Sequence, residues 1–175
     1  MKNPSMISFT QYLRESPERR WKPLQGKELK REFHPRGGEI DSQLKSYDKG
    51  HMKAPQSVID GMRFLHSNPQ HLAHALSLPR EEWNKKRIRS ENVLNTSAHD
   101  SWEDAKGSLD NAKVLRAEQN RKGIQTSPTM LRVTDERGKT HHWLLGGNTR
   151  LTAMEDTDSA LVHVIDPSEH LRKRV

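Results

Sequence analysis

Apolar positions between residues 56 and 89 recur at the spacing of amphipathic helices. One group follows the i, i+3, i+4 pattern that places side chains on a single helix face: Val58, Ile59, Met62 and Leu65. A second group continues the pattern further along the chain: Leu72, Ala75 and Leu76. Pro69 and Pro79 suit the first turn of a helix, where proline is tolerated. This region therefore predicts two or three short helices.

The most complete helical pattern covers residues 101–122. Ser101 can cap its N-terminus, and Gly123 supplies a C-terminal stop. Apolar residues recur at helical spacing along it: Trp102, Ala105, Leu109, Ala112 and Leu115. Gly107 and Ser108 weaken its middle, so the alternative is a helix that begins at Ser108.

Two strand-like runs, residues 129–134 and 140–145, lie on either side of a short polar segment. The intervening Asp135-Glu136-Arg137-Gly138-Lys139 has the glycine and polar residues of a hairpin turn. A last apolar run at residues 161–165 predicts another strand. Helices and strands together predict the α+β class, with a small mixed sheet and helices packed against it.

Residues 14–53 show no sustained periodicity and are expected to be irregular. The interruptions are prolines and paired glycines: Pro17, Pro23, Pro35, Gly37 and Gly38. The chain then divides into a basic N-terminal extension with short helices (residues 1–87), an α+β domain (residues 88–166) and a basic tail (residues 167–175). One compact core with an appendage suits a chain of 175 residues.

The chain is strongly basic. Lys and Arg number 30 against 23 Asp and Glu, which gives a formal net charge of +7. This balance favours polyanionic partners, DNA first, although a basic surface can also serve solubility alone. Arg19, Arg20, Trp21 and Lys22 form a candidate nucleic-acid-binding arm, in which the cations lie along phosphates and the indole stacks on a base. The alternative is a solvated linker.

Cysteine is absent, which excludes disulfides, thiolate nucleophiles and cysteine-based zinc sites. No apolar run approaches the ~18 residues that a membrane helix needs, so we expect a soluble, cytoplasmic protein without a membrane partner. The opening Ser8-Phe9-Thr10-Gln11-Tyr12-Leu13 resembles leaders of tailed-phage proteins, in which case the compartment is the host cytoplasm.

The turn Gly146-Gly147-Asn148-Thr149-Arg150 is the strongest candidate for ligand chemistry, because a strand leads through two glycines into a helix start. Glycines allow a ligand to approach the backbone closely, and amides at a helix N-terminus carry partial positive charge. Arg150 adds a fork of donors that matches phosphate oxygens. The turn therefore predicts phosphate binding. The alternative is an ordinary glycine turn with Arg150 ion-paired on the surface.

This turn resembles the signature of the ParB/sulfiredoxin superfamily, in which a strand leads into a Gly-x-x-Arg turn and a helix rich in Ala and Leu. The order of elements over residues 88–166 is similar too: a first strand at residues 88–96, a helix ending at Gly123, a proline-led strand, a hairpin, the turn and a final strand. The resemblance implies a ParB/sulfiredoxin-like sheet whose turn binds the phosphates of a nucleotide or of nucleic acid. The positions that would do so are Gly146, Gly147, Asn148, Thr149 and Arg150.

The sequence departs from the family pattern at two positions of the turn. Sulfiredoxins have their catalytic cysteine where Asn148 stands and a histidine where Thr149 stands, so sulfinic-acid reduction is excluded. Partition ParB proteins carry Glu-Arg-Arg where this chain has Asn148-Thr149-Arg150, which argues against a CTP-dependent clamp.

Catalysis at the turn would need a carboxylate or imidazole nearby to activate water, a hydroxyl or a metal. The catalytic candidates are Glu91, His99 and Asp100, because the loop that holds them faces the turn in the resembling fold. Their alternative roles are helix capping and surface solvation. His71 and His74 have an i, i+3 spacing, but no further ligand lies nearby and no metal site is predicted.

These observations predict a ParB-like protein that binds DNA or nucleotide phosphates and acts as a DNA nuclease or DNA-modifying enzyme. One alternative is a phosphotransferase that uses ATP or another nucleoside triphosphate with Mg²⁺. The other is a non-catalytic module in which the N-terminal region recognises a partner.

Overall fold

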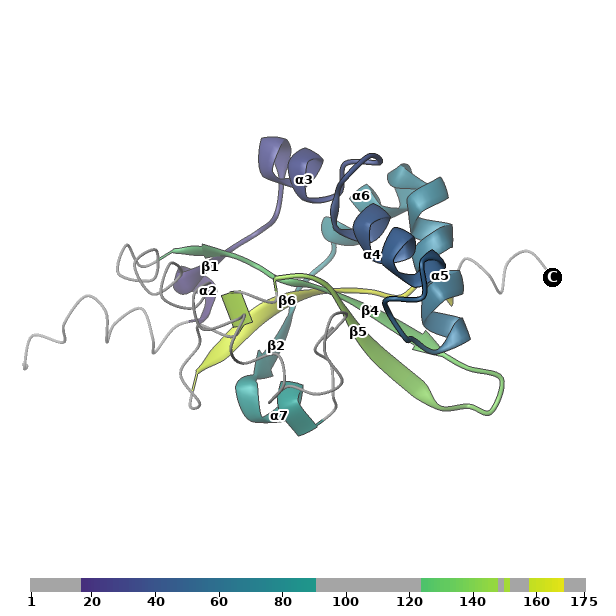
Figure 1. Ribbon diagram of the computed structural model, residues 1–175. Helices are drawn as coiled ribbons and strands as arrows, with labels where there is room; N and C mark the ends of the chain where they lie inside the picture. The colour runs from purple at the N-terminus through teal and green to yellow at the C-terminus, as the bar shows by residue number, and fades with distance from the viewer. Residues whose placement is uncertain (1–16, 91–123, 148–149, 152–157, 169–175) are drawn as a thin grey trace, which may run out of the picture.

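A computed structural model describes residues 17–90, 124–147, 150–151 and 158–168, and its centre is a four-stranded mixed sheet (Figure 1). Its strands, in spatial order, are β2 (Glu81–Asn84), β6 (Ser159–Ile165), β4 (Thr129–Thr134) and β5 (Thr140–Gly146). β4 and β6 are parallel, while the other two pairings are antiparallel. The predicted α+β class is confirmed.

The predicted hairpin joins β4 to β5, and the predicted last strand is β6. Asp135 stabilises the hairpin turn, since one of its carboxylate oxygens accepts hydrogen bonds from the backbone N–H groups of Arg137 and Lys139, both at 2.9 Å. Gly138 has a φ of +82°, a conformation that residues with a Cβ rarely adopt. The polar residues of the turn thus specify its geometry.

Helices α4 (Glu39–Asp48), α5 (Gln56–Ser67) and α6 (Pro69–Leu76) cover one face of the sheet (Figure 1). Two or three short helices were expected over residues 56–89, and α5 and α6 confirm two of them, while α7 (Lys85–Ser90) begins near the end of that range. Their apolar stripes and the facing side chains of the sheet form the larger core: Val58, Ile59, Met62, Leu65, Leu72, Leu76, Leu131 and Val133. Each fully buried aliphatic side chain contributes about 1.5–3 kcal/mol relative to its exposed state.

A second core lies on the opposite face of the sheet, beside α7 (Lys85–Ser90). Its buried members include Trp83, Ile88, Met130, Leu144, Ala160 and Val162. Met130 and Leu131 are neighbours in β4 but belong to different cores, as expected when successive side chains point to opposite faces of a strand. The sheet is therefore buried on both faces.

A small two-stranded parallel sheet lies beside the main one. It pairs β1 (Trp21–Lys22) with β3 (Gln125–Thr126). β1 follows α2 (Pro17–Arg20), and α3 (Gly26–Glu32) comes next along the chain. This pairing brings the start of the described chain close to the segment that leads into β4.

The structure differs from the expected irregularity of residues 14–53, because α3 and α4 form there. Pro23 lies between α2 and α3, and the Pro35–Gly38 segment lies between α3 and α4. These prolines and glycines prevent one long helical periodicity, but they separate short helices rather than abolish them.

The division expected near residue 88 does not coincide with a break in packing. β2 precedes that residue and pairs with β6, and α5 packs on β4. The strand expected at residues 88–96 is also corrected: residues 88–90 belong to α7, and the preceding strand is β2. The rest of that range and the helix predicted at residues 101–122 lie outside the described residues.

Candidate functional site

The strand-to-helix corner predicted to bind phosphate forms where β5 ends at Gly146. Gly147 has a φ of +104°, and its carbonyl accepts a 2.9 Å hydrogen bond from the N–H of Leu151. A Cβ on Gly147 would lie 2.9 Å from the Cα of Pro128, so both its conformation and its close neighbour require glycine. Asn148 and Thr149 lie outside the described residues.

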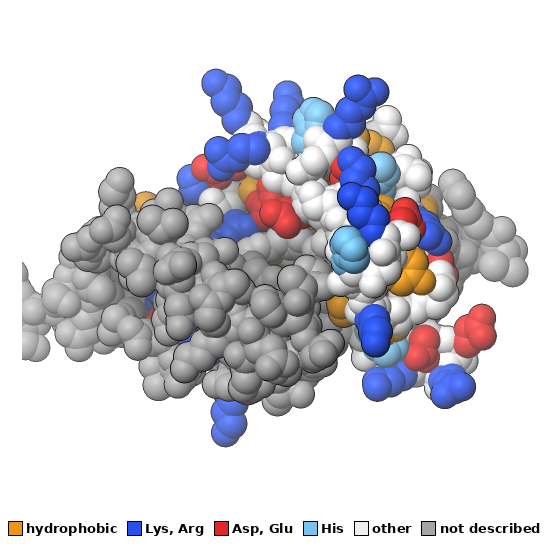
Figure 2. Space-filling model, viewed as in Figure 1, with side chains coloured by type: hydrophobic (Ala, Val, Ile, Leu, Met, Phe, Trp, Pro, Cys, Tyr) orange, Lys and Arg blue, Asp and Glu red, His pale blue; other side chains and the backbone are white. Residues whose placement is uncertain are grey.

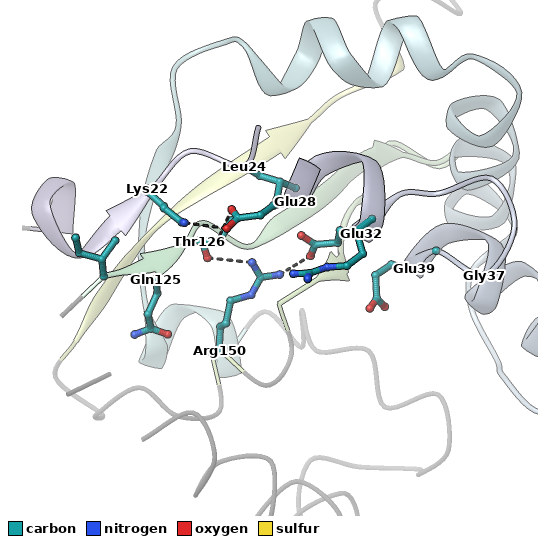
Figure 3. Close-up of a pocket in the computed structure, with 12 residues that line it drawn as sticks. Lys22, Leu24, Glu28, Glu32, Gly37, Glu39, Gln125, Thr126 and Arg150 are labelled. Carbon is teal, nitrogen blue, oxygen red and sulfur yellow. Dashed lines mark hydrogen bonds and ion pairs between the residues drawn. The ribbon is translucent and has the colours of Figure 1, made fainter. Parts of the chain in front are cut away.

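Arg150 turns back from this corner into the protein and is only 7% exposed. Its Nη1 donates to the carbonyl oxygens of Thr126 at 3.1 Å and Ser127 at 3.5 Å. Its Nη2 donates to the carboxylate of Glu32 at the end of α3, and the two side chains form an ion pair (Figure 3). The guanidinium is therefore fixed in place by two backbone carbonyls and one carboxylate.

The Glu32 carboxylate also lies against the backbone of Gly146, where any Cβ would collide with it. A negatively charged group thus occupies the concave side of the corner, in contact with both a glycine and the arginine. The alternative expectation, an Arg150 ion-paired on the surface, is correct about the ion pair, but Arg150 is buried and Glu32 is only partly exposed.

A polar cleft of about 500 Å³ opens in front of this pair. It lies between α3, the start of α4 and β3, and its charged lining residues are Lys22, Glu28, Arg31, Glu32, Glu39 and Arg150. Three cations and three carboxylates therefore face one another across the cleft (Figure 3). The exposed side chain of Ile124 adds an apolar surface to its lining.

One carboxylate of the cleft is already satisfied by a neighbour. Glu28 accepts hydrogen bonds from Lys22 Nζ at 2.9 Å and from Thr126 Oγ1 at 3.3 Å. The hydrogen bond from Lys22 is the main cause that lowers the pKa of Glu28. Glu28 is therefore an ionised group that holds β1 and β3 to α3.

Glu39 differs, since its carboxylate makes no hydrogen bond or ion pair with the described residues. Glu39 remains exposed to solvent, yet partial desolvation of its carboxylate by the cleft walls raises its pKa. The nearby charge of Glu32 raises the pKa further, while Arg150 opposes both effects. Glu39 is the carboxylate of the cleft best suited to accept or release a proton.

The predicted nucleic-acid-binding arm is integrated into the fold. Arg20 is buried in an ion pair with Asp158, and Trp21 is 1% exposed, with its indole N–H donating to the carbonyl of Ser159 at 3.1 Å. The expectation that Trp21 stacks on a base is corrected, because β1 holds its ring inside the core. Of this segment, Lys22 alone lines the cleft.

The catalytic candidates Glu91, His99 and Asp100 lie outside the described residues. His141 and His142 lie on the hairpin, where His141 contacts Asp135 and His142 contacts Arg132; neither lines the cleft. Three residues of the cleft were not among those predicted from the sequence: Glu28, Glu32 and Glu39. The i, i+4 spacing of Glu28 and Glu32 was the available signal, because it places both on one face of a helix.

Charge on the visible face is mixed. Figure 2 shows Lys and Arg side chains projecting from the helical side of the molecule, with acidic side chains between them. Within the described part of the chain, no three His, Asp or Glu side chains converge to hold a metal ion. None of the described helices combines the length and apolar character of a membrane span. Comparisons with protein-family models, curated proteins and solved structures found no match to this chain.

Proposed function

We propose that the cleft binds the phosphate group of a nucleotide or of nucleic acid, which replaces the Glu32 carboxylate at the corner. The observation that carries this proposal is the position of Glu32 itself: a carboxylate rests on Gly146 and pairs with Arg150. A corner that accepts the protein's own anion has the shape and charge to accept another. The ParB-like resemblance of the turn supports the same role.

Exchange of partners is physically reasonable because a phosphate offers more negative charge and more acceptor oxygens than a carboxylate. An arginine binds either group through two parallel hydrogen bonds. Arg150 would keep its bonds to the carbonyls of Thr126 and Ser127 during the exchange, since these use Nη1 while Glu32 uses Nη2. Only the Glu32 side chain has to move.

The size and lining of the cleft favour a single nucleotide over a duplex. A volume of about 500 Å³ lies within the range of small-molecule sites, roughly 300–1,000 Å³. Exposed Ile124 offers an apolar surface for the face of a base. Because the three carboxylates offset the three cations, a triphosphate would bind best together with Mg²⁺.

Calorimetric titration with MgATP, ADP and a short single-stranded oligonucleotide tests the proposal. Glu32→Gln should raise affinity for the phosphate ligand about tenfold, since it removes the competing charge, and Arg150→Lys should lower affinity by a similar factor. Glu81→Gln is the matched control, because Glu81 also pairs with an arginine, Arg132, outside the cleft. Equal affinities of Glu32→Gln and wild type for every probe would contradict the proposal.

A phosphotransferase is the second candidate, and the unpaired Glu39 carboxylate favours it. With a raised pKa, Glu39 is suited to take the proton of an acceptor hydroxyl as that oxygen attacks the terminal phosphorus. This activity predicts ADP release only when an acceptor is supplied, and its loss in Glu39→Gln with nucleotide affinity retained. A nuclease instead predicts metal-dependent nicking of plasmid DNA, and a non-catalytic module predicts neither activity.

A further inference from the structure

A second pocket, of about 680 Å³, shares Leu24 with the polar cleft but none of the cleft's other lining residues. It is formed by the segment between β1 and α3, the end of α6 with the residues that follow it, and β6. Polar and apolar surfaces contribute about equally to its walls, and Leu24, Leu29, Leu76 and Leu78 are among the apolar residues. Leu78 is 50% exposed, and with Ile124 it is one of two large apolar side chains exposed among the described residues. The pocket therefore combines apolar side chains, one of them solvent-exposed, with polar groups.

Arg80 supplies the positive charge in this pocket. Its Nη1 donates to the Trp21 carbonyl at 2.8 Å and to Ser127 Oγ at 2.9 Å. Its Nε and Nη2 make no hydrogen bond to the described residues, and no carboxylate there lies at ion-pair distance. Burial lowers the pKa of Arg80, while the negative charge of Glu18 opposes that effect. A partly buried guanidinium whose Nε and Nη2 have no partner among the described residues is suited to a carboxylate.

His163 also lines the pocket. Its Nε2 accepts a 3.0 Å hydrogen bond from the backbone N–H of Leu24, which leaves the proton on Nδ1. That nitrogen is fully buried and has no hydrogen-bond partner among the described residues. Burial and the charges of Arg80 and Arg150 lower the pKa of His163 to about 4, so the ring is neutral. The charged residues that line the pocket are therefore the cation Arg80 and the carboxylate Glu18.

We propose that this pocket binds a small monocarboxylate with an apolar body. The carboxylate pairs with the Nε–Nη2 edge of Arg80, and the apolar body lies against Leu24, Leu29 and Leu76 and reaches Leu78. Glu18 lines the same pocket without pairing with Arg80, and its negative charge disfavours a phosphate dianion more than a single carboxylate. The pocket is therefore chemically distinct from the phosphate site proposed at Arg150.

Titration of the full chain with hexanoate, followed by two-dimensional ¹H–¹⁵N NMR, tests this site. Hexanoate should shift the resonances of residues 76–80 and the Arg80 side chain, whereas hexanamide, which has the same apolar body without the charge, should bind at least tenfold more weakly. Leu78→Gln should weaken hexanoate binding several-fold, because it removes an apolar contact from an already exposed position. Ile124→Gln is the matched control and should leave hexanoate binding unchanged.

The result is independent of the phosphate site, since Glu32→Gln should not alter hexanoate affinity even if it alters nucleotide affinity. Bound carboxylate should also raise the pKa of His163, which a titration of its ring carbon resonances reports. The proposal is overturned if hexanamide binds as well as hexanoate, if Leu78→Gln and wild type bind equally, or if inorganic phosphate produces the same shifts as hexanoate.

Discussion

Buried His163 links the stability of the protein to pH. Its pKa falls from an ordinary 6.5 to about 4 in the folded state, so the unfolded chain binds more protons between these values. Stability is therefore lost as pH falls from about 6.5 towards 4. We expect this residue to account for roughly 2–3 kcal/mol of lost unfolding free energy between pH 7 and 4.5.

Urea unfolding of wild type and His163→Gln at the two pH values measures that contribution. The glutamine carbonyl can still accept from Leu24 N–H but does not titrate, so the variant should lose less stability on acidification. Protonation of Glu39, whose pKa is raised, stabilises the folded state in the same range and partly offsets the loss in both proteins. Identical pH dependence in the two proteins would show that His163 is not the responsible group.

The Arg150–Glu32 ion pair also affects the stability of the protein. Arg150 is buried and the Glu32 side chain is only 13% exposed, so loss of one partner leaves a poorly solvated charge without compensation. Arg150→Met should destabilise the protein by about 3–5 kcal/mol, whereas Glu32→Met combined with Arg150→Met should cost clearly less. Chemical unfolding of the two single variants and the double variant gives the coupling energy. Additive losses would indicate that the two groups do not interact.

At the scale of elements, the contact between α5 and β4 depends on Gly61. A Cβ there would lie 3.0 Å from Val133 Cγ1 and 3.2 Å from Leu131 Cδ2, so the helix backbone is packed directly on the sheet. Gly61→Ala should destabilise the protein by about 1–3 kcal/mol through overpacking, despite the better helix propensity of alanine.

Ser57 in the same helix provides the comparison for this test. Its hydroxyl is buried and has no hydrogen-bond partner within the described part of the chain, so Ser57→Ala should be neutral or stabilising. Thermal unfolding of the two variants measures the contrast. A stabilising Gly61→Ala would mean that α5 can shift away from β4 without loss.

Elements with a strong local signal were predictable, and elements without one were not. α5, α6 and the hairpin showed clear periodicity or turn chemistry, and all three formed where expected. α3 is short and has no buried side chain, so it lacks the apolar stripe that would identify it. Glu32, which pairs with Arg150 in the candidate site, lies on that helix. The sequence therefore predicted the glycine turn and Arg150 but not their acidic partner.

For the whole molecule, the two described parts of the chain on either side of residues 91–123 form one fold. β2 pairs along its full length with β6, and α5 supplies much of the larger core beneath β4. A fragment that begins at residue 88 should therefore be unfolded, because it lacks β2 and the helices α4, α5 and α6, which cover one face of the sheet. Narrow amide dispersion in its NMR spectrum, beside a dispersed spectrum of the full chain, is the expected result; a dispersed fragment would support an independent C-terminal domain.

The sequence alone determined the local elements: amphipathic helices, a hairpin, a final strand and a glycine corner followed by arginine. These depend on spacing and turn chemistry within about a dozen residues, which a linear chain displays directly. Only the tertiary structure decided which groups meet, because Glu32 and Arg150 are 118 positions apart and their pairing depends on how α3 lies over the sheet. The same holds for the burial of Trp21 and the pocket around Arg80, since burial is a property of the packed chain.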